Sequence, residues 1–408
     1  MKLESTEQER AISISELPPL PNYRNADVCN VVPAAFLHLA KSRGSLFGTS
    51  FGEVEERVHT INPGFTPDLE SWFPKEASRA SQLALVVLDG LGFRQLAKFS
   101  NDMPNFAAFS QIDITSVAPT TTATALTSIS TGATPSTHGM LGYRMGLEND
   151  QVLNALSWSV KGSTVGRAPD PESLQPVMPF LNFHPKVVTK AQYQETGFTK
   201  AHLRGTNMFD YRLPSSMVDH VAELLRQGEA FVYAYYEGID TVAHEYGLRA
   251  CYLEELREVD YLLGRLMDSL PKGGMLLVTS DHGQVEVPDA PIELDARIME
   301  CTRMLSGEGR FRWLHLKPGT LGKVIDIARE LYGRDAWVMS RDELIEGGYY
   351  GSHFKTRIEE TRLGDVALIS KTNVAFLDPL DTGPYDLVCR HGSLTEEELL
   401  VPLLSYLA

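Results

Sequence analysis

The run Leu83-Ala84-Leu85-Val86-Val87-Leu88-Asp89-Gly90 is the stretch of sequence that best indicates the fold. Six apolar residues in succession are typical of a strand that is buried on both faces, as in a parallel sheet. Asp89 and Gly90 then end the run with a carboxylate and a turn residue. In open α/β sheets ligands bind beyond the carboxyl ends of the strands, so Asp89 stands where such a site is expected.

Two further apolar runs end in residues that can bind a metal ion. The run that starts at residue 230 is followed by Asp240 and His244, and the run that starts at residue 275 leads to Asp281 and His282. Asp240 and His244 are four residues apart, so their side chains share one face if a helix begins there. Aspartate and histidine are ordinary zinc ligands. The sequence therefore predicts three strand ends that bring carboxylates and imidazoles to one rim of a sheet.

Each of these signals has a simpler alternative. An Asp-Gly pair after a strand is often only a turn, and an Asp-x-x-x-His pattern is often a solvated helix face. The string Ser280-Asp281-His282-Gly283 is compatible with a helix cap. The occurrence of all three signals in order, each behind a predicted strand, favours a common site.

A turn rich in hydroxyl groups, Pro119-Thr120-Thr121-Thr122, lies between the first and the second of these runs. It follows a predicted strand at residues 112–117 and opens a predicted helix of small residues. Exposed amides and the helix dipole favour an anion, or a developing negative charge, at such a helix start. A helix N-cap needs one hydroxyl group, whereas this turn offers three in succession.

These motifs together resemble the alkaline phosphatase superfamily, and most closely its nucleotide pyrophosphatase/phosphodiesterase branch. The resemblance covers roughly residues 80–408, with the motifs in the right order. It rests on Asp89-Gly90, the threonine turn, the stretch from Ser130-Thr131-Gly132 to His138-Gly139, Asp240-x-x-x-His244, Asp281-His282-Gly283 and His391-Gly392.

The resemblance implies a hydrolase with a threonine nucleophile and two divalent ions. Thr122 would be the nucleophile and would form a covalent phospho-threonine. A bound ion would activate its hydroxyl, as zinc lowers the pKa of bound water from about 15.7 to about 7. Mixed Asp and His ligation suits zinc best, and manganese tolerates the same ligands. The implied ligands are Asp240, His244 and His391 for one ion, and Asp89, Asp281, His282 and Thr122 for the other.

The chain departs from the family pattern beside the nucleophile. Ala123 and Ala125 stand where eukaryotic members carry larger residues, which predicts little aromatic wall for a base and tolerance of different leaving groups. Members also keep an asparagine shortly after the His138-Gly139 pair, and ungapped counting puts Tyr143 there, with Arg144 next to it. Either side chain can donate to a phosphoryl oxygen, so we expect both to bind substrate.

Several related functions are alternatives to a phosphodiesterase or nucleotide pyrophosphatase. A phosphonate hydrolase of the phosphonoacetate type shares all seven of the implied metal-binding residues, Thr122 included. A phosphomonoesterase would use the same chemistry. A sulfatase would need a C/S-x-P-x-R string at the nucleophile, and a cofactor-independent phosphoglycerate mutase would need a serine followed by a large insertion. An inactive relative that only binds phosphorylated molecules would be expected to lack some of the metal-binding residues.

Composition is that of an ordinary globular chain, and the family resemblance implies a small phosphorylated substrate. The 408 residues are 43% hydrophobic and 22% charged, with a formal net charge of −16. Without a stripe of Lys and Arg, a nucleic-acid polymer is not an expected partner. The polar start of the chain lacks an apolar signal segment, and no apolar stretch is long enough to span a membrane. The four cysteines have no paired spacing, so we expect buried free thiols and a cytoplasmic protein.

The order of predicted elements indicates an α/β fold in which a mostly parallel central sheet has helices on both faces. Residues 1–79 are predicted to form a polar leader and a packing segment with a short helix at 32–40. Residues 80–408 are predicted to form the catalytic domain, with a long helix at 249–268. The segment 283–390 is too long for a loop and contains a strand-like stretch at 311–316 and a helix-like stretch at 321–331, so we expect a capping subdomain.

Two further histidines and a helix cap complete the predictions. Thr395 and Glu398 have the spacing of a capping box, which would place His391 just before a helix. His138 and His353 are expected to be structural, because the ligand set is complete without them.

Overall fold

The computed structural model describes residues 17–66, 69–162, 167–288, 290–351, 354, 357–381 and 387–408. Its largest element is a seven-stranded sheet, in which β18 runs antiparallel to both of its neighbours and the remaining pairs are parallel. The order of its strands is β4 (Ser110–Thr115), β18 (Leu400–Leu407), β11 (Gly274–Thr279), β3 (Gln82–Leu88), β10 (Phe231–Tyr236), β8 (Lys186–Lys190) and β9 (Asn207–Tyr211).

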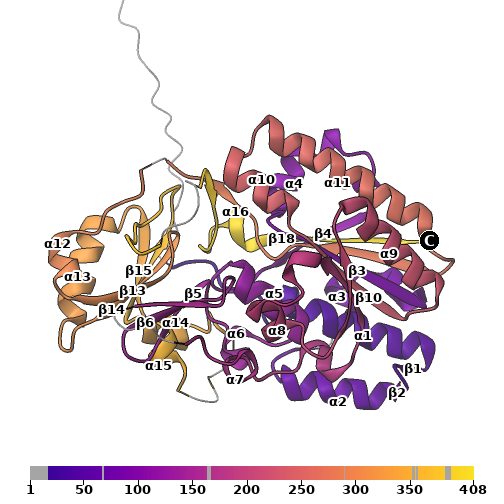
Figure 1. The fold of residues 1–408 in the computed structure, drawn as a ribbon, viewed down its shortest axis with the longest axis horizontal. Coiled ribbons are helices and arrows are strands. Elements are labelled where there is room, and N and C mark those ends of the chain that lie inside the picture. Colours follow the sequence, from indigo (N-terminus) through magenta and orange to yellow (C-terminus); the bar gives the residue numbers. More distant parts are fainter. Residues whose placement is uncertain are drawn as a thin grey trace, which may run out of the picture.

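The three apolar runs of the sequence are the three central strands of this sheet. In β3 alternate side chains enter two different cores, because successive side chains of a strand point to opposite faces. Leu83, Leu85 and Val87 join one core, and Ala84 and Val86 join the other. Helices cover both faces (Figure 1), so the expected fold class is confirmed.

The helices divide between the two faces of the sheet. One core contains side chains of α1 (Val28–Arg43), α2 (Phe51–Ile61), α5 (Thr122–Thr131) and α8 (Gly197–His202). The other contains side chains of α4 (Phe93–Phe99), α9 (Pro214–Arg226), α10 (Gly238–Tyr246) and α11 (Ala250–Ser269). The predicted long helix at 249–268 is therefore α11, and the short helix expected at 32–40 is part of the longer α1.

A second sheet lies beside the first, on the left in Figure 1. Its antiparallel strands are ordered β13 (Thr302–Glu308), β14 (Phe311–Leu316), β16 (Val366–Ser370) and β15 (Ala336–Ser340). The helices α12 (Ala296–Met299) and α13 (Leu321–Tyr332) share a core with one face of this sheet. Side chains of the other face, including Trp313 and Ile369, belong to the main core. The strand and helix expected inside segment 283–390 are thus β14 and α13, and the treatment of this segment as a capping subdomain stays a prediction.

Shorter elements connect these layers. A three-stranded antiparallel sheet is formed by β5 (Arg144–Leu147), β6 (Gln151–Asn154) and β7 (Ser159–Gly162). The remaining strands are β1 (Ser45–Leu46), β2 (Thr49–Ser50), β12 (Val285–Glu286) and β17 (Cys389–Arg390). The remaining α-helices are α3 (Leu69–Trp72), α6 (Pro135–His138), α7 (Pro171–Leu174), α14 (Arg341–Glu346), α15 (Glu359–Arg362) and α16 (Glu396–Leu399).

Residues 17–25 are packed more closely than a loose leader would be. Tyr23 is buried, and its hydroxyl donates to Tyr349 O at 2.7 Å and accepts from Ala118 N at 3.1 Å. The first sixteen residues of the expected leader lie outside the described residues. Among the described helices none is long and apolar enough to cross a membrane.

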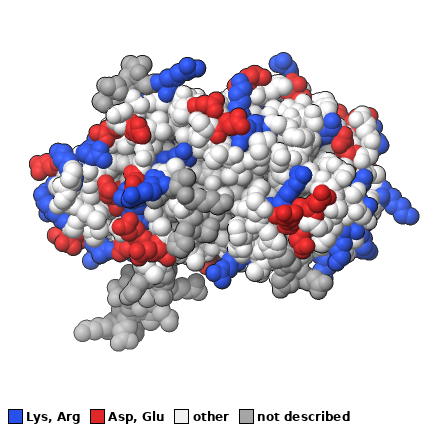
Figure 2. Space-filling view, turned by 90° about the horizontal axis from the view of Figure 1, so that it is seen from below, with Lys and Arg blue, Asp and Glu red and all other residues white. Residues whose placement is uncertain are grey.

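All four cysteines are free thiols, as expected from their spacing. Cys29, Cys301 and Cys389 are buried. Cys251 is exposed near the start of α11, so the expectation of burial is wrong for this residue. On the face shown in Figure 2, Lys and Arg side chains lie among Asp and Glu side chains.

Candidate active site

Three adjacent strands deliver the predicted ligands to one end of the main sheet. The strands β11, β3 and β10 are neighbours, and β3 is parallel to both of the others. Asp89 follows β3 directly, Asp281 follows β11 by two residues, and Asp240 lies in the first turn of α10 behind β10. Because parallel strands end at the same edge, residues far apart in the chain meet there.

The first group of ligands consists of Asp89, Asp281 and His282. His282 Nε2 lies 3.4 Å from Asp89 Oδ1 and 3.3 Å from Asp281 Oδ2. All three side chains are buried. The ligand atoms lie within 4.8 Å of one another, which is close enough to hold one ion.

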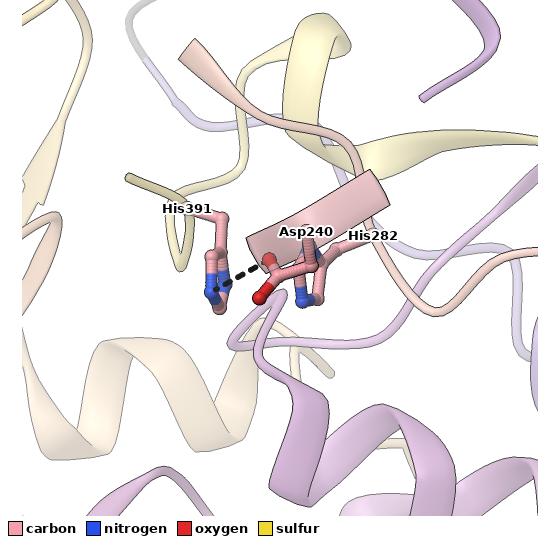
Figure 3. A group of neighbouring side chains, drawn as sticks. All are labelled: Asp240, His282 and His391. Atoms are coloured by element: carbon pink, nitrogen blue, oxygen red, sulfur yellow. Dashed lines mark ion pairs between the residues drawn. The ribbon is translucent and has the colours of Figure 1, made fainter. Parts of the chain in front are cut away.

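The second group is built around Asp240. Its Oδ1 lies 3.3 Å from His244 Nε2 and 4.0 Å from His391 Nε2. Asp240, His282 and His391 also form a possible metal-binding triad, and Figure 3 shows their side chains directed toward one another. The rings of His282 and His391 are stacked with centroids 3.6 Å apart. The two groups are therefore contiguous, because His282 of the first group also lies close to Asp240 and His391 of the second.

Each of the three imidazoles is oriented by a backbone carbonyl. The Nδ1 atoms of His244, His282 and His391 lie 2.7 Å from Cys389 O, 3.1 Å from Gly283 O and 2.9 Å from Thr120 O. A carbonyl can only accept, so each Nδ1 carries a proton, and Nε2 is the atom through which each imidazole can bind a metal ion. This is the arrangement in which histidines bind metal ions.

Burial shifts the pKa values of the carboxylates and of an imidazole in this site. Burial, together with the neighbouring Asp281 and Asp240 carboxylates, raises the pKa of Asp89 well above its usual range. Burial also raises the pKa of Asp281 to about 6, against the opposing backbone hydrogen bonds, and lowers the pKa of His282 to about 4. Among the described residues, Asp89 Oδ1 and Asp281 Oδ2 are buried without a hydrogen-bond partner. Unpaired buried carboxylate oxygens beside neutral imidazoles fit divalent cations.

Thr122 is the first residue of α5 and lies beside the first group. Its Oγ1 is 3.1 Å from His282 Nε2, and the residue is buried. Thr120 faces elsewhere, because its hydroxyl donates to Ser393 O at 2.6 Å and accepts from Gly392 N at 3.1 Å. Of these two threonines of the turn, Thr122 is the one whose hydroxyl reaches the ligands.

A cavity of about 180 Å³ opens beside Thr122. It is bordered by Asp89 and Asp240 on the side of the ligands, and its wall includes Tyr193, Phe198 and Tyr235. The expectation of little aromatic wall is therefore wrong for the cavity as a whole. That expectation was based only on the residues next to Thr122 in the sequence. The aromatic side chains come instead from β10 and from the segment between β8 and the end of α8.

Comparison with known proteins decides the family. The model of the family "type I phosphodiesterase / nucleotide pyrophosphatase" matches residues 83–394. The chain belongs to this family. It is therefore a member of the alkaline phosphatase superfamily, and its family acts on phosphoric esters. A search of curated protein sequences finds no match.

Solved structures of this phosphodiesterase family and of a related hydrolase share the fold. Murine ectonucleotide pyrophosphatase/phosphodiesterase 5 is 18% identical with a TM-score of 0.60, over 79% of this chain and 87% of that one. An inactive form of the murine protein in complex with AMP gives a TM-score of 0.59 at the same identity and coverage. Phosphonoacetate hydrolase from Sinorhizobium meliloti, in complex with phosphonoformate, is 18% identical with a TM-score of 0.57, over 79% of this chain and 89% of that one.

Arg144 and Tyr143 of this phosphodiesterase family member are both engaged with other side chains. Arg144 is buried and forms an ion pair with Asp378, with Asp381 3.6 Å away. Tyr143 accepts a hydrogen bond from Asn154 Nδ2 at 2.6 Å, and burial raises the pKa of its phenol. Their role as substrate-binding residues stays a prediction.

Two residues outside the sequence motifs form hydrogen bonds that orient metal ligands. The hydroxyl of Tyr235 donates to Asp89 Oδ2, and Gln284 Nε2 donates to Asp240 Oδ1 at 2.8 Å. The only sequence signal for Tyr235 is its place in the strand before Asp240, and Gln284 directly follows Asp281-His282-Gly283. Neither residue type identifies itself as a partner of a metal ligand.

The loop that carries His391 is held by a buried ion pair instead of a capping box. Thr395 makes no side-chain hydrogen bond to the backbone of α16, so the predicted capping box is wrong. Glu398 instead binds Arg310 with two hydrogen bonds of 2.8 and 2.7 Å and accepts from Ser393 N at 3.0 Å. Both charged side chains are fully buried. The histidine does precede the short helix α16.

Of the two histidines expected to be structural, His138 is bound away from the ligands. Its Nδ1 accepts from Met140 N at 3.0 Å, so its Nε2 carries the proton and donates to Ser128 Oγ at 2.8 Å. The contact with Ser128 ties α6 to α5. His353 lies outside the described residues.

Proposed function

We propose that the protein is a metal-dependent hydrolase of phosphodiesters or nucleotide pyrophosphates that acts through a covalent intermediate on Thr122. The observation that carries this proposal is the position of Thr122 Oγ1, 3.1 Å from His282 Nε2 at the start of a helix and at the wall of the cavity. A hydroxyl in this position is adjacent to His282, which touches both ligand groups, and to space for a leaving group. Family membership supports the reaction class.

The residues suited to hold two divalent ions are those of the two ligand groups, with Asp240, His244 and His391 at one ion and Asp89, Asp281, His282 and Thr122 at the other. When bound, the ions lower the pKa of the threonine hydroxyl and neutralise charge on the phosphoryl group. Zinc suits this mixture of carboxylates and neutral imidazoles best, and manganese is the alternative.

The reaction consists of two displacements at phosphorus. Thr122 Oγ1 loses its proton to water and attacks phosphorus, and the bond to the leaving oxygen breaks with its electron pair. A water molecule then attacks the phospho-threonine, the bond between phosphorus and Oγ1 breaks, and the threonine oxygen regains a proton. The amides at the start of α5 and the helix dipole stabilise the negative charge that develops beside Thr122.

The charges near the cavity favour a diester over a monoester. A monoester dianion needs one more positive partner than a diester monoanion, and the guanidinium of Arg144 is already paired with Asp378. The aromatic side chains of Tyr193, Phe198 and Tyr235 offer flat apolar surface to an aryl or nucleoside leaving group. The proposed substrate is therefore a small phosphorylated molecule. The proposed compartment is the cytoplasm.

A comparison of three substrates tests this function. The values of kcat/KM for bis-p-nitrophenyl phosphate, p-nitrophenyl phosphate and phosphonoacetate are measured on one zinc-loaded preparation. We expect the diester to be the best substrate. A hundredfold preference for the monoester would identify a phosphomonoesterase, and turnover of phosphonoacetate alone would identify a phosphonate hydrolase. No turnover of any of the three by a protein with both ions bound would favour an inactive relative.

A further inference from the structure

Gln284 connects the two ligand groups of the site. It belongs to the same loop as Asp281 and His282, but its side chain reaches the other group, where Nε2 donates to Asp240 Oδ1 at 2.8 Å. The side chain is fully buried. One neutral amide thus ties the loop behind β11 to the first turn of α10.

The amide of Gln284 is closely packed against Gly90 and Asp240. A Cβ atom on Gly90 would lie 2.5 Å from Gln284 Nε2 and 3.0 Å from Asp240 Cα, so a side chain at position 90 would displace the amide. Gly90 also has a φ of 77°, which disfavours other residues. The backbone carbonyl of Gln284 accepts from Gln95 Nε2 at 2.6 Å, which fixes the loop from the other side.

We propose that Gln284 is a positioning residue that sets the orientation of the Asp240 carboxylate and thereby the affinity of the ion held by Asp240, His244 and His391. This inference rests on the proposed function, because it requires ions at the ligand groups. Removal of hydrogen-bond partners of ligands typically weakens metal binding about 10- to 100-fold.

The chemistry of an amide suits this role. An amide N–H donates to Asp240 Oδ1 and leaves the second lone pair of that oxygen for the cation. Because the amide is neutral, it does not compete with the cation for the negative charge of the carboxylate, as a lysine or arginine would. The buried Oε1 of Gln284 has no hydrogen-bond partner among the described residues, so the hydrogen bond to Asp240 is the polar contact that the amide group makes.

Zinc titration of metal-free protein tests the inference. Gln284→Met removes the amide and keeps the volume of the side chain, and Gln284→Asn keeps an amide that is too short to reach Asp240. Gln175→Met is the matched control, because Gln175 is equally buried and its Nε2 donates to Ala201 O at 2.7 Å, which is no part of the site. Zinc affinity is measured against a competing chelator, and the Tm of each metal-free variant is measured in parallel.

We expect the wild-type protein and Gln175→Met to bind two equivalents of zinc with equal affinities. Both variants of Gln284 should bind one equivalent normally and the other about 10- to 100-fold more weakly. Gln175→Met should lower the metal-free Tm at least as much as Gln284→Met, because Gln175 also accepts from Val177 N at 2.6 Å and so loses two hydrogen bonds instead of one. Unchanged zinc affinity in the Gln284 variants, or an equal loss in Gln175→Met, overturns the inference and leaves the proposed function standing. Failure of the wild-type protein to bind zinc overturns both.

Discussion

At the scale of single residues, the proposed chemistry depends on one hydroxyl in α5. Thr122 and Thr124 lie two residues apart in the same buried helix, but they differ in their contacts. Thr122 Oγ1 lies beside His282, whereas Thr124 Oγ1 is buried and has no hydrogen-bond partner in the part of the chain that the structure describes.

Substitution of these two threonines by valine separates catalysis from packing. Thr122→Val should fold and lose activity roughly a thousandfold or more, since removal of a nucleophile typically costs that much. Thr124→Val removes an unpaired buried hydroxyl at constant shape and should keep nearly full activity and stability. Steady-state kinetics with bis-p-nitrophenyl phosphate and circular dichroism make the comparison. Comparable activity of the two variants would rule out Thr122 as the nucleophile.

At the scale of elements, the tip of the β13–β14 hairpin holds the loop that carries His391. Arg310 stands in this tip and forms the buried pair with Glu398. Its Nη1 also donates to Thr372 O and Val374 O, at 2.9 and 2.8 Å. Because Glu398 in turn accepts from Ser393 N, the second sheet fixes the backbone two residues after His391.

Two glutamates in α16 provide a test of this connection. Glu398→Gln should destabilise the protein by about 3 to 5 kcal/mol, because it leaves the buried guanidinium of Arg310 without its counter-charge. Glu396→Gln breaks an exposed pair with Arg94 and should cost about 1 kcal/mol or less. Urea denaturation at neutral pH gives both values. Equal losses for the two variants would show that the buried pair does not support the loop.

Elements and ligands were predictable from the sequence to different degrees. The central strands β3, β10 and β11 are continuous apolar runs, and the ligands directly follow these strands or a short turn, so periodicity and local spacing were sufficient. The aromatic wall of the cavity was not predictable, since Tyr193 and Phe198 come close to Thr122 only through the order of strands in the sheet. For Glu398 the local spacing was misleading: a Thr-x-x-Glu pattern normally caps a helix, but a buried arginine from a distant hairpin binds this carboxylate more strongly than an amide would.

At the scale of the whole molecule, one buried carboxylate couples folding to pH. Asp27 caps α1, where Oδ1 accepts from Cys29 N at 3.0 Å and Oδ2 accepts from Thr115 Oγ1 at 2.7 Å. Burial raises the pKa of Asp27 from 3.8 to about 7 in the folded protein. Between these two values the folded state binds more protons than the unfolded state, so this carboxylate makes the free energy of unfolding fall as pH rises.

Asp27→Asn should remove this dependence, because asparagine is an equally good N-cap and does not titrate. Relative to the wild type, the variant should gain roughly 1 to 4 kcal/mol between pH 4.5 and pH 8, as each pKa unit corresponds to about 1.4 kcal/mol. Asp113→Asn, which changes an exposed carboxylate on β4, is the control and should show no such gain. Urea denaturation at the two pH values measures the difference, and a constant difference for Asp27→Asn would contradict the assigned pKa.

The stereochemical course at phosphorus tests the central claim most directly. A chiral phosphorothioate diester with a p-nitrophenyl leaving group is hydrolysed in ¹⁸O-water, and the configuration of the product is determined by ³¹P NMR. Two successive in-line displacements, one by Thr122 and one by water, each invert the configuration, so the account predicts overall retention. Overall inversion would mean that water attacks the substrate directly, and it would contradict a covalent intermediate on Thr122.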